Sequence, residues 1–159
     1  MPIIIDGHNL IPKIPGLSLQ AIDDEMQLIE MLQEYCRRSR KQAEVFFDNA
    51  PPGTPRARNF TNLTARFVRE GQTADQAIRG KLKRLGGEAR NWTVVSSDRE
   101  VQSSARAVRA SVIPSEIFAR QLLQTLAQSN QERETLEKTL SEEEIDEWLE
   151  LFGSDEEND

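Results

Sequence analysis

The chain has 159 residues, of which 37% are hydrophobic and 30% charged, and it carries a formal net charge of −7. This length and composition are typical of one globular domain with an ordinary core and room for an appendage. No apolar run approaches the roughly 20 residues of a membrane-spanning helix, and the first residues lack the pattern of a signal peptide. We therefore expect a cytoplasmic protein without a membrane partner.

The charge is distributed unevenly along the chain. Residues 51–113 hold twelve basic and five acidic side chains, a balance of +7, whereas residues 129–159 hold thirteen acidic and two basic ones, a balance of −11. Such asymmetry favours a polyanion as partner for the middle of the chain, although two merely solvated surfaces explain it equally well.

The first predicted element is a strand. Ile3, Ile4 and Ile5 form a β-branched run without alternation, which is typical of a strand covered on both faces in a parallel sheet. The run ends at Asp6, and Gly7 allows a sharp turn. We expect a loop over residues 10–18 and a helix over residues 19–40, where apolar residues recur every three or four positions.

The remaining elements alternate between strands and helices. Strands are predicted over residues 43–47, 63–68, 91–98 and 110–113, and helices over residues 74–85, 99–108 and 116–128. Residues 50–55 hold three prolines and a glycine, which indicates an irregular loop. Thr73 is the expected N-cap of the helix at 74. This order predicts an α/β fold of three layers, with a central, mainly parallel sheet, over residues 1–128.

Beyond residue 128 the sequence becomes polar and acidic. We expect a polar linker or helix extension over residues 129–140, an amphipathic helix over residues 141–153 and an acidic, disordered tail over residues 154–159. The apolar stripe of this helix consists of Ile145, Trp148, Leu149 and Phe152. It either folds back on the domain or docks a protein partner, and its pattern does not distinguish the two.

Four aspartates form the candidate site. Asp6, Asp48 and Asp98 end predicted strands, and Asp75 lies in the first turn of a predicted helix. Because parallel strands end at one edge of a sheet, these carboxylates can converge there, where they repel each other unless a cation lies among them. Hard oxygen ligands favour Mg²⁺ or Mn²⁺, which can activate water and stabilise a phosphoryl displacement. That chemistry suits phosphodiester hydrolysis.

Other residues extend or limit this hypothesis. Asn9 can hold a water or orient Asp6, and the candidate RNA contacts are Arg56, Arg58, Arg79, Lys83 and Arg99. Taken singly, each aspartate fits a turn or a helix cap better than a metal site, so the hypothesis depends on the set. Cys36 and His8 stand alone in the chain and supply neither a zinc site nor an obvious catalytic thiol pair; we expect His8 to line a loop or pocket. No glycine-rich dinucleotide or P-loop motif occurs.

Four segments carry a resemblance to a known family: IIDGHNLI (residues 4–11), VFFD (45–48), EGQTAD (70–75) and SSDREV (96–101). As a set they resemble the motifs of YacP-like NYN domain proteins, which are relatives of PIN nucleases. The resemblance implies a PIN-like α/β sandwich with metal-dependent endoribonuclease activity, and mRNA at the ribosome as one candidate substrate. It also implies that Asp6, Asp75 and Asp98 bind the metal, that Asp48 flanks them and that Asn9 supports the site.

The chain departs from this family pattern after Asp75. Gln76 and Arg79 stand where acidic residues are common, which reduces the negative charge of the site. The leading hypothesis is an Mg²⁺- or Mn²⁺-dependent endoribonuclease. The alternatives are a non-catalytic RNA- or ribosome-binding module of the same fold and a protein-interaction adaptor that uses the stripe over residues 145–152.

Overall fold

A computed structural model of the chain describes residues 2–17, 23–50, 53–69 and 71–128. Its centre is a sheet with the strand order β3-β4-β2-β1-β5-β6. The strands are β1 (Ile3–Asp6), β2 (Ala43–Phe47), β3 (Ala57–Asn59), β4 (Leu63–Phe67), β5 (Thr93–Val95) and β6 (Ser111–Ile113). β3 pairs antiparallel with β4, and the other pairs are parallel. The predicted mixed α/β fold with a mainly parallel sheet is therefore confirmed.

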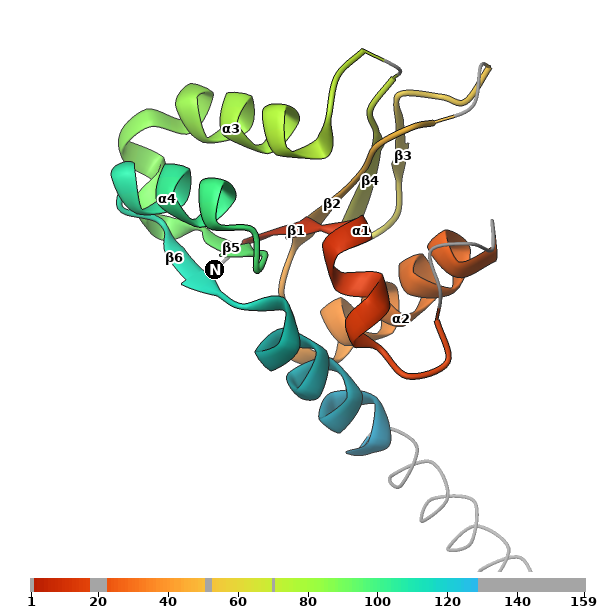
Figure 1. Cartoon of the computed structure of the whole chain (residues 1–159). Coiled ribbons are helices and arrows are strands. Elements are labelled where there is room, and N and C mark those ends of the chain that lie inside the picture. Colours follow the sequence, from red (N-terminus) through yellow and green to blue (C-terminus); the bar gives the residue numbers. More distant parts are fainter. Residues whose placement is uncertain (1, 18–22, 51–52, 70, 129–159) are drawn as a thin grey trace, which may run out of the picture. The chain divides into compact units, whose positions relative to one another are not determined.

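Helices cover both faces of this sheet. The helices are α1 (Gly7–Leu10), α2 (Asp23–Ser39), α3 (Ala74–Leu85), α4 (Arg99–Ala107) and a helix over residues 115–128, with short 3₁₀ helices η1 (Ile11–Lys13) and η2 (Gly86–Asn91). Figure 1 shows α3 and α4 on one side of the sheet and α1 and α2 on the other. The helix that begins at residue 115 packs against α2, where the rings of Tyr35 and Phe118 meet edge to face. This is the expected three-layer arrangement.

The core explains why the strands lack an alternating polar pattern. Ile4, Phe46 and Val94 pack in one buried cluster with Ile78 of α3 and Val101 of α4. Neighbouring side chains of a strand point to opposite faces, so the buried residues on either side of these three face the other layer. Both faces of the central strands are thus apolar, as in other sheets that lie between helices.

The segment after β1 differs from the prediction. We expected a sharp turn at Gly7 and a loop from residue 10, but α1 begins at Gly7 and η1 follows it directly. The glycine is needed for a close approach to β2, because a Cβ there would lie 2.4 Å from Cε1 of Phe47. The loop prediction is therefore wrong for residues 10–13.

The other elements follow the predicted order. Thr73 caps α3 in a capping box with Gln76, in which each side chain bonds the backbone N–H of the other residue. β3 and η2 were not predicted. The linker, the amphipathic helix and the acidic tail expected over residues 129–159 lie outside the described residues. Within the described part of the chain, no helix has the length and apolar character needed to span a bilayer.

Candidate active site

Asp6 is a buried carboxylate at the end of β1, with 8% of its surface exposed. Its Oδ2 accepts a hydrogen bond from the hydroxyl of Ser96, 3.2 Å away, and the backbone N–H of Asn9 also donates to the carboxylate. The pKa of Asp6 is raised to about 6, chiefly by burial. The nearby charges of Asp48 and Asp98 contribute to the rise, and the two hydrogen bonds oppose it. Asp48, which follows β2, and Asp98, which caps α4 after β5, are thus close enough to Asp6 for their charges to act on it.

Asp98 lies at this edge as the N-cap of α4. Its Oδ1 accepts hydrogen bonds from the backbone N–H groups of Glu100 at 2.8 Å and Val101 at 3.3 Å. Its own N–H donates to Oγ of Ser96 at 3.0 Å. The Ser96 hydroxyl therefore connects Asp6 with the backbone of Asp98, and both cap bonds go to Oδ1 of Asp98.

Asn9 holds three segments together beside Asp6. Its Oδ1 accepts hydrogen bonds from the backbone N–H of Ser97 at 2.8 Å and from the hydroxyl of Ser115 at 2.7 Å. The side chain thus ties α1 to the segments that follow β5 and β6, while its backbone N–H bonds Asp6. Asn9 supports the position of Asp6 through its backbone N–H rather than through its side-chain amide.

Asp48 belongs to an ion-pair cluster around His8. Nδ1 of His8 lies 2.6 Å from Oδ1 of Asp48, and Nε2 lies 3.1 Å from Oε1 of Glu25. The hydrogen bond with Glu25, followed by that with Asp48, raises the pKa of His8 above 6.5 despite its partial burial. His8 was expected only to line a loop or pocket, and its role as a bridge between two acids was missed.

Asp75 is engaged by Arg79, one turn further along α3. The guanidinium donates from Nε to Oδ1 at 3.1 Å and from Nη2 to Oδ2 at 2.6 Å, and it also lies 3.3 Å from Oε2 of Glu100. These bonds raise the pKa of Arg79, to which the charge of Asp98 contributes as well. Arg79 thus places a positive charge next to Asp75 and near Asp98.

Asp6 and Asp98 offer hard oxygen donors, the kind of ligand that Mg²⁺ prefers. In the described part of the chain, no three His, Cys, Asp or Glu side chains are arranged to hold a metal together. Mg²⁺, however, usually takes one or two carboxylates and fills its other positions with waters and substrate phosphates. Asp6 and Asp98 can supply two such carboxylates, whereas Asp48 and Asp75 are occupied by His8 and Arg79.

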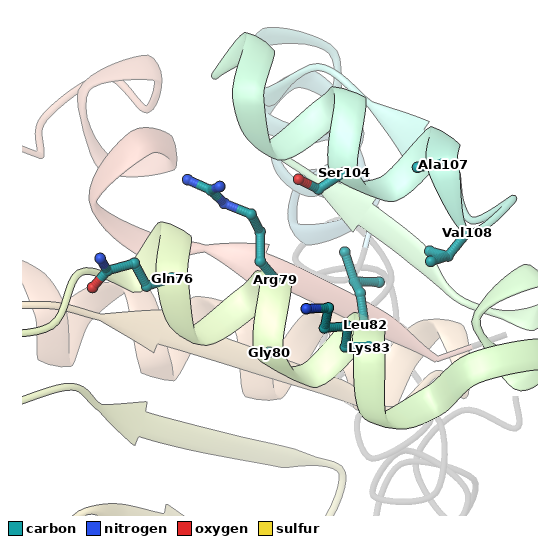
Figure 2. Close-up of a pocket in the computed structure, with 8 residues that line it drawn as sticks. All are labelled: Gln76, Arg79, Gly80, Leu82, Lys83, Ser104, Ala107 and Val108. Carbon is teal, nitrogen blue, oxygen red and sulfur yellow. The ribbon is translucent and has the colours of Figure 1, made fainter.

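The basic residues expected to bind RNA are not all on one surface. Arg79 and Lys83 line a groove of about 540 Å³ between α3 and α4 (Figure 2). Arg56 lines a second groove, and Arg99 is exposed at the start of α4. Arg58 lies against α2, with Nη1 3.5 Å from Sδ of Met26. Arg58 is therefore separated from the others by the sheet.

Comparison with known proteins decides the family. The family model described as "YacP-like NYN domain" matches residues 3–152. The chain belongs to this family. A crystal structure of Rae1 (YacP) from Bacillus subtilis matches with a TM-score of 0.74 and 20% identity over 97% of this chain and 93% of that one. A tryptophan-to-leucine mutant of Rae1 matches with a TM-score of 0.68 and 24% identity over 89% and 88%. Comparison with curated proteins finds no match.

Membership in the YacP-like NYN family gives the site a context. The similarity to Rae1 shows that the two proteins share the PIN-like fold. The NYN family belongs to a nuclease-type superfamily with an RNA-related function, and PIN-like nuclease domains generally use divalent metal ions.

Proposed function

We propose that this YacP-like NYN domain is a metal-dependent endoribonuclease that cuts RNA at the sheet edge where Asp6 and Asp98 lie. The observation that carries the proposal is the buried carboxylate of Asp6, whose pKa is raised to about 6 by burial and by two neighbouring acids. Perturbed carboxyl groups gathered at the carboxyl ends of parallel strands are typical of functional sites. An accumulation of like charge of this kind is relieved by a cation.

Mg²⁺ or Mn²⁺ bound here would supply a polarised water and neutralise charge on the phosphate oxygens. In the proposal, Asp6 and Asp98 hold the ion, Ser96 fixes the position of Asp6, and Asn9 anchors α1 beneath it. Asp48 and Asp75 are further metal-binding acids, which become available when His8 and Arg79 release them. Hydrolysis by this route leaves a 5′-phosphate and a 3′-hydroxyl.

The substrate that we propose is single-stranded RNA, including mRNA, with the ribosome as a partner. Support comes from the RNA-related function of the family and from cationic side chains near the acids. The phosphate contacts proposed on the α3 side of the sheet are Arg56, Arg79, Lys83 and Arg99, and Arg58 is proposed to contact a separate part of the RNA on the α2 side. We place the nuclease domain within residues 1–128 of a cytoplasmic protein and leave residues 141–153 as a candidate helix for a protein partner.

The direct test is cleavage of a labelled single-stranded RNA by the wild-type protein and by Asp98→Asn, in Mn²⁺ and in EDTA. Asparagine is as good an N-cap as aspartate, so the variant removes the charge and keeps the start of α4. We expect cleavage only with Mn²⁺, and a loss of at least roughly a hundredfold in Asp98→Asn. Glu30→Gln, an exposed acid on α2, is the matched control. Full activity in Asp98→Asn would show that the site is elsewhere.

A non-catalytic RNA-binding module is the second candidate, and the ion pair between Asp75 and Arg79 favours it. A tethered guanidinium can neutralise a carboxylate that a metal would otherwise need. The two candidates differ in the effect of Mn²⁺ on the melting temperature, because an ion that binds only the folded protein stabilises it. A rise that saturates with Mn²⁺ supports the nuclease, whereas RNA binding without any such rise supports the module.

A further inference from the structure

α3 lies between two grooves. One faces α4 and is lined by Arg79 and Lys83 (Figure 2). The other lies toward β4 and has a volume of about 630 Å³, and we call it the α3–β4 groove. Gln76 and Gly80 each line both grooves. The surface of α3 that separates the grooves is therefore narrow. A polymer bound in one groove lies next to the other groove.

The α3–β4 groove is strongly cationic. Four arginines line it, namely Arg56, Arg66, Arg69 and Arg84, and no acid is among the described residues that do so. Arg66 is neutralised in part by Glu44, 3.2 Å away. The other three make no ion pair with any acid of the described chain. Uncompensated cations that share a groove repel each other unless an anion lies between them.

The groove begins beside the candidate acids. Gln76, which lines it, follows Asp75 in the first turn of α3, and Arg84 lies in the last turn of the same helix. Arg84 lies nine positions after Asp75, which is about 13.5 Å along a helix. A polyanionic chain with one phosphate at the acid edge can thus continue along α3 toward Arg84.

We propose that the α3–β4 groove binds the phosphate backbone of an RNA strand on one side of the bond to be cut. The position of that bond rests on the proposed function. Arg56, Arg69 and Arg84 contact the phosphates, because a guanidinium offers paired donors that match phosphate oxygens. Arg66 keeps its bond with Glu44 and contributes charge. Contacts with phosphates alone make this part of the binding independent of RNA sequence.

The test measures the affinity of the full chain for a fluorescently labelled single-stranded oligoribonucleotide in EDTA, over a series of salt concentrations. The variant is Arg69→Ala combined with Arg84→Ala, both exposed residues. Each lost phosphate contact reduces the slope of log affinity against log salt by about 0.7 for a single strand. We expect a slope smaller by about 1.4. If the wild-type and variant lines meet at 1 M salt, this difference corresponds to roughly 25-fold weaker binding of the variant at 0.1 M salt.

The matched control is Arg90→Ala combined with Arg120→Ala, which removes the same charge from exposed residues outside both grooves. Equal slopes for the groove variant and this control, with unchanged melting temperatures, would overturn the proposal. Failure of the proposed function has a different signature. If the wild-type protein does not cut RNA with Mn²⁺ but only the groove variant loses affinity, the groove is supported and the nuclease is not.

Discussion

The hydroxyl of Ser96 donates a hydrogen bond to Oδ2 of Asp6, 3.2 Å away, and so connects the ends of β1 and β5 inside the protein. This bond favours the ionised form of Asp6, but burial opposes it more strongly and raises the pKa to about 6. At neutral pH the fold therefore contains an ionised carboxylate in a place that disfavours ionisation, and the cation of the proposed function would relieve this cost.

The first prediction concerns the stability cost of this carboxylate. The pKa of Asp6 is about 6 in the folded protein and near 3.8 in the unfolded chain, so the folded state binds more protons between these values. The free energy of unfolding consequently falls as the pH rises through this range, by about 3 kcal/mol for a full shift. Asp6→Asn removes the charge and should melt above wild type at pH 8 in EDTA, but level with it below pH 4. A gap that does not vary with pH would contradict this account.

The second prediction concerns His8. It is the single histidine of the chain, so the imidazole signals in an NMR spectrum belong to it. Glu25 and Asp48 stabilise its charged form, so NMR titration should give a pKa above 6.5. Its stabilising effect is present below that pH and is lost as the pH rises through the folded pKa. Glu25→Gln should lower the pKa, because Glu25 is the largest cause of the shift, whereas Glu30→Gln on the same helix should not. An equal response of both variants would show that the bond with Glu25 is unimportant.

The third prediction concerns the contact between α1 and β2. A Cβ at Gly7 would lie 2.4 Å from the ring of Phe47 and 2.9 Å from the carbonyl oxygen of Phe46, which cannot move like a side chain. Gly7→Ala should therefore lower the free energy of unfolding by about 1–3 kcal/mol in denaturant titrations. Gly87→Ala is the control, because a Cβ there meets nothing within 4 Å. Equal stability of the two variants would mean that α1 shifts away from β2 without cost.

The fold could be predicted well because its central strands and long helices carry clear hydrophobic patterns. The continuous apolar run of Ile3 to Ile5 indicates a strand between two layers, and the structure buries it completely. The missed elements are short. α1 spans four residues and β3 three, too few to show a helical or alternating period, and their conformation depends on contacts with β2 and β4.

The candidate site could be predicted only in part. Parallel strands that lead to Asp6, Asp48 and Asp98 imply convergence, and the charges of Asp48 and Asp98 do act on Asp6. The direction of each side chain depends on contacts that the sequence does not reveal, such as the bond between His8 and Asp48, which are 40 residues apart. The ion pair of Asp75 and Arg79 could have been predicted from the sequence, because its i, i+4 spacing is typical of helical ion pairs.

The fourth prediction follows from that helical pair. Arg79→Gln should release Asp75 and remove a positive charge near Asp98, so Mn²⁺ should bind roughly tenfold tighter if Asp75 belongs to the metal site. The measurement is the Mn²⁺ concentration at which half of the rise in melting temperature is reached, without RNA. Arg90→Gln is the matched control. An unchanged Mn²⁺ requirement in Arg79→Gln would remove Asp75 from the site.

RNA cleavage by Asp6→Asn and wild type at pH 7.5 with Mn²⁺ tests the proposed site at the end of β1, with RNA affinity measured in parallel in EDTA. Asparagine keeps one oxygen that can accept the bond from Ser96, replaces the other with an uncharged NH2 group and removes the buried charge, so the fold should be kept. We predict that Asp6→Asn binds RNA as wild type does and loses metal-dependent cleavage. Cleavage at the wild-type rate by the folded variant would contradict the central claim that the buried carboxylate at the end of β1 serves a nuclease site.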